Sequence, residues 1–224
     1  MTERSILRRI RGMDTSDGAG VRLKRIIGQP GLDMVDPFLL LDEFRSDQAG
    51  DYIAGFPEHP HRGFETVTYM LAGHMQHGDN HGNRGDLGPG SVQWMTAGRG
   101  ILHSEMPQQE NGLMWGFQLW VNLPATDKMT APRYQDIAPD RIPVVHPSDG
   151  VEVRVIAGER LGRSELAVLS KGDSVRIAGR DAAARVLLVA GKALQEPVAR
   201  YGPFVMNTPE QIHEAIADFR AGKF

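Results

Sequence analysis

The sequence predicts an all-β protein, a β-sandwich or a β-barrel, on three observations. Glycine (26 residues) and proline (14 residues) are spread along the chain and divide it into short segments. Most of these segments alternate with the period of two that a strand requires. Turn signals such as Ala72-Gly73, Gly82-Asn83 and Pro89-Gly90 separate them. Many short strands joined by glycine turns are typical of sandwiches and barrels.

The expected strands follow in chain order. Residues 59–71 alternate with period two, and residues 91–96 are a second candidate. Residues 113–123 show the clearest pattern, with apolar side chains at every odd position. Residues 184–190 are almost wholly apolar and form a fourth candidate. Such a run is consistent with a strand that is buried on both faces.

One helix is expected, at the C-terminus. Thr208 fits an N-cap, Pro209 fits the first helical position, and Gln211 completes a capping box. An apolar stripe follows at helical spacing, and Gly222 offers a stop. The stripe consists of Ile212, Ala215, Ile216 and Phe219. We expect the helix to pack on the outside of a sheet.

Composition excludes several classes of function. The chain has no cysteine, which excludes disulfides, iron–sulfur clusters, thiolate zinc sites and cysteine nucleophiles. The net charge of −3 predicts no direct binding to nucleic acid, and no apolar stretch is long enough for a membrane span. The arginines of residues 4–11 alternate with apolar residues and indicate an edge strand or surface arm. We expect a soluble cytoplasmic protein.

Composition predicts a domain boundary at residues 132–147, a segment with four prolines and little periodicity. It divides the chain into a first domain over residues 1–131, a linker over 132–147 and a second domain over 148–224.

The candidate functional residues are two spaced pairs, His59 with His61 and His103 with Glu105. Alternate residues of a strand face the same side, so each pair projects its ligand atoms together. Three imidazoles and one carboxylate leave positions open on an octahedral ion, which suits catalytic Fe(II) or Mn(II). Zinc, nickel, copper or cobalt fit the same ligands. The pattern therefore predicts a metal site.

Two further groups are assigned other roles. Glu65 shares the parity of His59, but a bulge at Gly63 would reverse its direction, so we place Glu65 outside the ligand set. His74, His77 and His81 lie among glycine, Asn and Asp, which favours a solvated hairpin loop over a second metal site.

Five stretches resemble the pirin family, and together they cover nearly the whole chain. They are FPEHPHRGFETVTY (56–69), GNRG (82–85), QWMTAGRGILHSEM (93–106), QLWVNL (118–123) and YGPFVMNT (201–208). The resemblance implies two cupin domains, jelly-roll β-barrels, with one metal in the N-terminal barrel. Carried over by motif, its ligands are His59, His61, His103 and Glu105.

The resemblance also implies a function. Several pirins are Fe(II)-dependent quercetin 2,3-dioxygenases, which open the flavonol ring with O2 and release carbon monoxide. We therefore expect Fe(II) as the cofactor, a small aromatic substrate with O2, and Glu105 as both ligand and catalytic base. Other pirins are described as regulators, so the alternative is a metal-dependent protein that binds a transcription factor or a metabolic enzyme. A third class is a protein whose metal is purely structural.

The chain departs from the pirin pattern in its second half. Pirins continue after the segment equivalent to residues 151–159 through several strands, whereas here residues 160–163 lead directly into what resembles the late part of that barrel. We therefore expect a shortened second cupin domain followed by the C-terminal helix.

Overall fold

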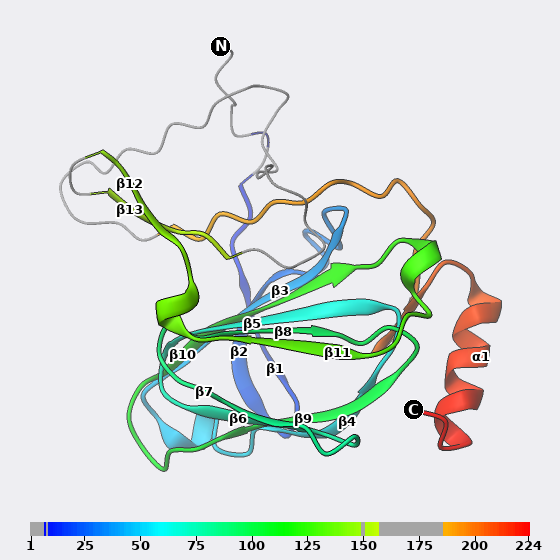
Figure 1. Ribbon diagram of the computed structural model, residues 1–224, viewed down its shortest axis with the longest axis horizontal. Coiled ribbons are helices and arrows are strands. Elements are labelled where there is room, and N and C mark those ends of the chain that lie inside the picture. Colours follow the sequence, from blue (N-terminus) through cyan, green and yellow to red (C-terminus); the bar gives the residue numbers. More distant parts are fainter. Residues whose placement is uncertain (1–6, 8, 149–150, 157–185) are drawn as a thin grey trace.

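The computed structural model describes residues 7, 9–148, 151–156 and 186–224, and its main feature is a barrel of two antiparallel sheets that face each other (Figure 1). The seven-stranded sheet has the order β1 (Met13–Asp17), β2 (Val21–Ile27), β3 (Phe38–Ser46), β10 (Met114–Asn122), β5 (Phe64–Ala72), β8 (Val92–Thr96) and β11 (Arg133–Ile137). The four-stranded sheet has the order β4 (Phe56–His61), β9 (Ile101–Pro107), β6 (Met75–Asp79) and β7 (Arg84–Leu87). The predicted all-β fold is confirmed.

The remaining elements follow the barrel or connect its strands. Two hairpins are formed by β12 (Val144–Ser148) with β13 (Val151–Arg154) and by β14 (Ala199–Tyr201) with β15 (Phe204–Met206). Helix α1 (Pro209–Arg220) packs at one end of the barrel, and the first hairpin extends away from it (Figure 1). Short 3-10 helices lie at Ala49–Asp51, Ala125–Asp127 and Pro139–Arg141.

The strand predicted over residues 113–123 is confirmed as β10, but its apolar positions do not face the barrel interior. Leu119 and Val121 pack in a cluster with Val67 and Ile142 on the outer face of the seven-stranded sheet. Ile142 belongs to the chain that follows β11. The sheet is therefore covered on both faces, and the inward positions of β10 are left to residues such as Gln118 and Trp120.

One end of the barrel interior is apolar and the other is polar. The apolar end contains Val21, Leu23, Phe44, Tyr52, Met70, Met75, Leu87 and Met114. At the other end, His61, His103 and Glu105 are buried, each with no more than 2% of its surface exposed. Buried polar groups require internal partners. The candidate functional residues lie at this polar end of the barrel.

Gly63 separates β4 from β5 and changes the direction of the side chains that follow. Its φ of 89° is in the left-handed region, and a Cβ there would overlap the carbonyl oxygen of Val205. The predicted strand over residues 59–71 is therefore two strands in different sheets. The expectation that Glu65 would be redirected by a bulge at Gly63 agrees with this geometry.

The C-terminal segment completes the barrel. Val205 of β15 is fully buried in a cluster with Leu39, Leu40, Phe64 and Trp120 of the barrel strands. Lys128, which is 1% exposed, donates from Nζ to Gly63 O (2.8 Å), Asn122 Oδ1 (2.7 Å) and Val205 O (3.0 Å). Burial lowers the pKa of Lys128 to about 8, so the ammonium form still predominates at neutral pH.

The C-terminal helix is confirmed with its caps. The Thr208 hydroxyl accepts from Gln211 N (3.3 Å), and Gln211 Oε1 accepts from Thr208 N (3.2 Å), which is the predicted capping box. Ile212 and Ala215 are buried against Phe204 and Met206 of β15. The helix is also tied to the barrel by an ion pair of 2.9 Å between the buried Arg62 and Asp218.

Two predictions about local structure differ from the structure. Residues 186–190 form no strand, and Val186 and Leu187 are exposed; residues 184–185 lie outside the described part. An apolar run becomes a strand only when a neighbouring strand supplies hydrogen bonds, and no described strand pairs with this one. His77 is in β6 and buried rather than in a solvated loop, whereas His74 and His81 are exposed. Half of the N-terminal arm predicted over residues 4–11 lies outside the described part, and its described residues, 7 and 9–11, form no strand.

Residues 132–147 contain β11, which extends the barrel sheet by pairing with β8, as well as most of β12. The division into domains at this segment stays a prediction. The described part of residues 148–224 contains β13, the β14–β15 hairpin and α1. The site of the expected shortening, immediately after residue 159, lies outside the described residues.

We predict that Lys128→Met lowers the free energy of unfolding by about 3 kcal/mol, because it leaves three buried oxygen acceptors without their donor. Urea denaturation monitored by tryptophan fluorescence measures this change. The exposed Lys192→Met is the matched control and should change the value by less than about 0.5 kcal/mol. Equal stabilities of the two variants would contradict the role of Lys128.

Candidate metal centre

Three of the four predicted ligands converge at the pairing of β4 with β9. His59 lies opposite His103 in the antiparallel register, and His61 lies two residues along β4 on the same face. One ring nitrogen from each of these histidines falls within 4.8 Å of the other two. Among the described residues, these three histidines are the group of His, Asp, Glu or Cys side chains whose ligand atoms lie close enough together to hold a metal ion.

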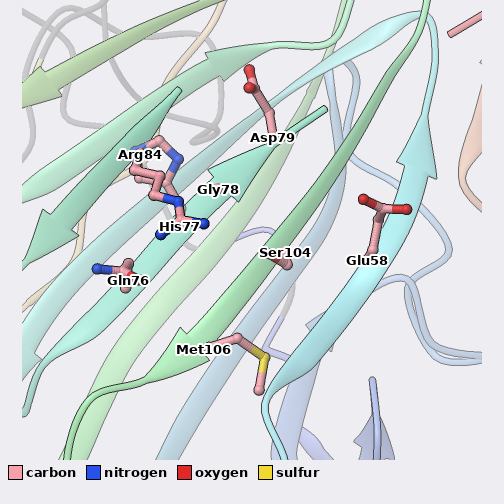
Figure 2. Close-up of a pocket in the computed structure, with 8 residues that line it drawn as sticks. All are labelled: Glu58, Gln76, His77, Gly78, Asp79, Arg84, Ser104 and Met106. Atoms are coloured by element: carbon pink, nitrogen blue, oxygen red, sulfur yellow. The ribbon is translucent and has the colours of Figure 1, made fainter. Parts of the chain in front are cut away.

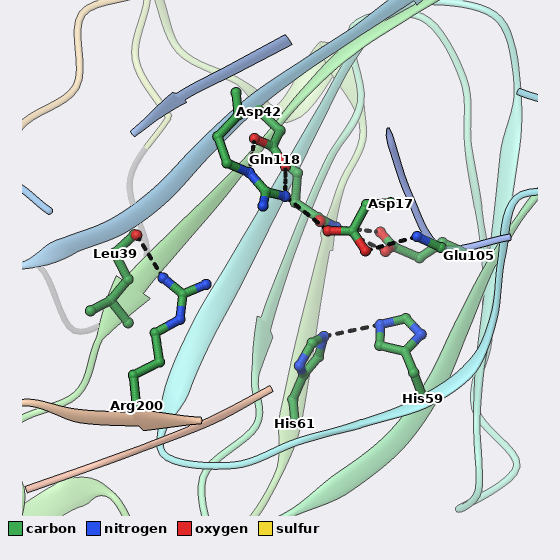
Figure 3. Close-up of polar contacts among 10 residues, drawn as sticks. Asp17, Leu39, Asp42, His59, His61, Glu105, Gln118 and Arg200 are labelled. Atoms are coloured by element: carbon green, nitrogen blue, oxygen red, sulfur yellow. Dashed lines mark hydrogen bonds and ion pairs between the residues drawn. The ribbon is translucent and has the colours of Figure 1, made fainter. Parts of the chain in front are cut away.

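The hydrogen bonds and burial of these histidines leave ring nitrogens with lone pairs that are free to bind a metal ion. His59 Nδ1 lies 2.8 Å from the carbonyl oxygen of Pro57, so Nδ1 carries the proton and Nε2 presents its lone pair. His59 Nε2 and His61 Nε2 are 3.0 Å apart (Figure 3). Burial lowers the pKa of both His61 and His103 well below the usual value, which favours neutral rings.

These residues fit a divalent metal ion. Imidazole nitrogens bind such ions at about 2.1 Å, so two ligands at right angles are roughly 3.0 Å apart, close to the observed His59–His61 separation. Both ring nitrogens of His103 are buried and have no hydrogen-bond partner among the described residues. A buried nitrogen without a partner costs free energy, and a bound cation would satisfy it.

The fourth predicted ligand, Glu105, lies beside this group but outside it. It is on the same inward face of β9 as His103 and is 2% exposed. Its carboxylate accepts hydrogen bonds from Gln118 and Thr68 (Figure 3 shows Gln118 and Glu105). The structure therefore brings the three histidines together. It places the Glu105 carboxylate two residues beyond His103 on β9, hydrogen-bonded to the seven-stranded sheet.

Glu65 faces away from the histidines. Its carboxylate accepts from Trp94 Nε1 (3.0 Å) and Thr96 Oγ1 (2.7 Å). Both donors lie on β8, whose residues Trp94 and Val92 pack in the outer cluster of the sheet. Glu65 thus connects strands on the outer face.

An aromatic wall adjoins the histidines. The His61 ring lies 5.0 Å from the Phe64 ring and 5.1 Å from the Trp120 ring, centroid to centroid. The guanidinium of Arg200, from β14, lies 4.9 Å from the centre of the Trp120 ring and donates to Leu39 O. Sequence reasoning missed these residues, because nothing local in the sequence indicates that β14 reaches the barrel.

A second polar group joins the buried His77 of β6 to Asp136 of the edge strand β11. His77 Nε2 is 3.3 Å from Asp136 Oδ2, and Gln93 donates to Asp136 Oδ1 at 3.1 Å. The hydrogen bond from His77 is the main reason why the pKa of Asp136 lies below its usual value. The Tyr134 ring stacks at 5.0 Å from His77.

A pocket of about 270 Å³ lies on the other side of the four-stranded sheet (Figure 2). Ser104 and Met106 line it, and these residues alternate with His103 and Glu105 along β9. The pocket is therefore on the outer face and is separate from the histidine group.

A barrel of two antiparallel sheets with three histidines converging inside it defines a cupin whose histidines form a site that can hold a metal. Two family models match the sequence: Pirin over residues 20–121 and Pirin C-terminal cupin domain over residues 145–224. A pirin-like protein of Caulobacter vibrioides is 46% identical, with all of both chains covered. Human pirin is 42% identical over 94% of this chain and 90% of its own. This chain belongs to the pirin family.

The similarity extends to a solved structure. The crystal structure of quercetin 2,3-dioxygenase from Acinetobacter baumannii matches with a TM-score of 0.81 and 29% identity, covering 100% of this chain and 99% of that one. The comparison with the Caulobacter protein spans 278 positions against the 224 residues of this chain, so about 54 positions have no counterpart here. The chain is therefore shorter than this relative. Among the described residues, no helix is long and apolar enough to cross a membrane.

We predict that the protein binds one divalent ion per chain and that His103→Gln lowers the affinity at least about 100-fold, because a ligand is removed from a buried site. Elemental analysis after dialysis against Co(II), together with thermal unfolding, measures this. At a free metal concentration 100 times Kd, the metal should stabilise the wild type by about 2.7 kcal/mol and His103→Gln by much less. The exposed His74→Gln is the control, and equal metal content in the two variants would contradict the site.

Proposed function

We propose that this protein is an Fe(II)-dependent dioxygenase that cleaves a flavonol such as quercetin with O2. The observation that supports this most is the convergence of ring nitrogens from three histidines, two of them buried and the third partly buried, next to a buried carboxylate and an aromatic wall. The similarity of the whole chain to a quercetin 2,3-dioxygenase structure supports the same chemistry.

Each residue has a role in this proposal. His59, His61 and His103 hold the metal through ring nitrogens, and Glu105 is the fourth ligand. Three or four protein ligands leave positions open on an octahedral ion. When bound, Fe(II) supplies a Lewis acid that makes the flavonol 3-hydroxyl more acidic and a position for dioxygen.

Glu105 also serves as the base. Its carboxylate is held inside the barrel, and the one acceptor position left on Oε2 would serve the metal before the substrate enters and the proton of the 3-hydroxyl afterwards. Phe64 and Trp120 present apolar surface beside His61, which suits a flat aromatic substrate and excludes water from the reacting oxygens. The ring then opens with uptake of O2 and release of carbon monoxide.

We predict that anaerobically iron-loaded protein consumes one O2 per quercetin and releases carbon monoxide, and that Glu105→Gln lowers kcat by a factor of about 10² to 10⁴, the usual contribution of a positioned base. An oxygen electrode and gas analysis measure both quantities. Metal content is determined in parallel, so that loss of iron is not mistaken for loss of the base.

Glu110→Gln is the matched control, because Glu110 is exposed just beyond the end of β9. It should retain wild-type activity. The proposal is wrong if the iron-loaded wild type consumes no oxygen with quercetin, or if His59→Ala consumes it equally fast.

A further inference from the structure

The carboxylate of Glu105 is held by two side chains that reach across the barrel from the seven-stranded sheet. Thr68 Oγ1 donates to Oε1 at 3.0 Å, and Gln118 Nε2 donates to Oε1 at 3.0 Å and to Oε2 at 2.8 Å. Thr68 of β5 and Gln118 of β10 are opposite each other in the strand register. A single position of the sheet therefore supplies all three hydrogen bonds.

The two oxygens of this carboxylate are not equivalent. An ionised carboxylate has about two acceptor positions on each oxygen. Oε1 accepts two hydrogen bonds and is filled, whereas Oε2 accepts one and has a position left. Glu105 shares its face of β9 with His103, so the oxygen with the remaining position belongs to a side chain beside the histidine group.

We propose that Gln118, together with Thr68, is a positioning residue that makes Glu105 a ligand through Oε2 alone. This inference rests on the metal centre proposed above and specifies how its fourth ligand is fixed. Because Oε1 is held by two donors, Glu105 cannot present both oxygens to a metal ion, and it binds in a monodentate way. Hydrogen bonds of this kind orient ligands and tune their affinity for metal.

A purely structural role would give a different result on substitution. If Gln118 only satisfied a buried charge, its removal would lower stability but leave the coordination of a bound ion unchanged. If it positions the ligand, its removal changes affinity and ligand geometry in the same direction as removal of the carboxylate. The visible spectrum of bound Co(II) reports coordination directly, which separates the two roles.

The chain offers a matched control for each donor. Gln93 is a buried amide on β8, which is separated from β10 by β5, and its Nε2 donates to Asp136 instead of Glu105. Thr66 is a buried threonine two residues before Thr68, and no hydrogen bond in the described structure joins it to Glu105. Both should reproduce the packing effects of the substitutions without the effect on Glu105.

The test is Co(II) binding to the metal-free full chain, with affinity from chelator competition and coordination from the visible spectrum. We expect Gln118→Met to bind Co(II) about 10- to 100-fold more weakly and to show the spectrum of Glu105→Gln. Thr68→Val should shift both in the same direction by less, and Thr68→Ser, which keeps the hydroxyl, should restore the wild-type values. Gln93→Met and Thr66→Val should match the wild type.

The proposal is overturned if Gln118→Met retains the wild-type affinity and spectrum, or if Glu105→Gln does. His103→Gln distinguishes this failure from failure of the metal centre itself. If His103→Gln loses Co(II) while Gln118→Met does not, only the positioning role is wrong; if His103→Gln binds normally, the centre is wrong. Melting temperatures of the metal-free variants establish folding, and the Thr68→Val and Thr68→Ser pair decides the question if Gln118→Met does not fold.

Discussion

The antiparallel pairing of β4 with β9 is the constraint on which the candidate centre depends. It places His59 opposite His103 and brings His61 to the same face, so three ligand atoms meet without any contribution from a loop. A register shift of one residue would turn the histidines of one strand to the outer face. The end of β4 is fixed by main-chain bonds: Arg62 N donates to Pro203 O, Val205 N donates to Arg62 O, and Gly63 N donates to Gly98 O. The geometry of the centre is therefore set by backbone hydrogen bonds from three separate segments of the chain.

At the histidine end of the barrel, the seven-stranded sheet carries polar side chains on its inner face and apolar side chains on its outer face. Much of the apolar surface of β5, β8 and β10 lies outside, under the chain that follows β11, while the inner face carries amides, hydroxyls, imidazoles and a carboxylate. Several of these buried atoms have no partner in the described structure, and they lie at inward positions: His61 Nδ1, His77 Nδ1, Gln93 Oε1, both nitrogens of His103, Trp120 Nε1 and Asn122 Nδ2. Such an interior is suited to a polar ligand or a metal ion, because either could supply the partners that these buried atoms lack.

Local patterns predicted the strands and the helix well, since period two, glycine turns and a capping box are properties of neighbouring residues. They also predicted the convergence of the three histidines, since residues two apart on paired strands must share a face. Glu65 faces away from the histidines because the chain changes direction at Gly63. The close contact of Gly63 with Val205 joins residues far apart in the sequence, so alternation alone could not predict it. His77 was misjudged because glycine and Asp in its surroundings suggested a loop, although pairing with β9 makes it an inner residue of β6. Residues 186–190 show the converse, since strong apolar character gives a strand only where a partner strand exists. The roles of Gln118, Trp120 and Arg200 depend on contacts across the barrel, so they could not be predicted from the spacing of residues in the sequence.

The burial of Val205 among barrel residues has a consequence for how the chain is made. Synthesis proceeds from the N-terminus, so β3, β5 and β10 leave the ribosome long before the segment that covers them. Until β15 arrives, Leu39, Phe64 and Trp120 lack part of their packing, and Lys128 lacks one of its three acceptors. The wall beside His61 is among the last parts to form. The order of translation therefore places completion of this part of the barrel after β15 has emerged.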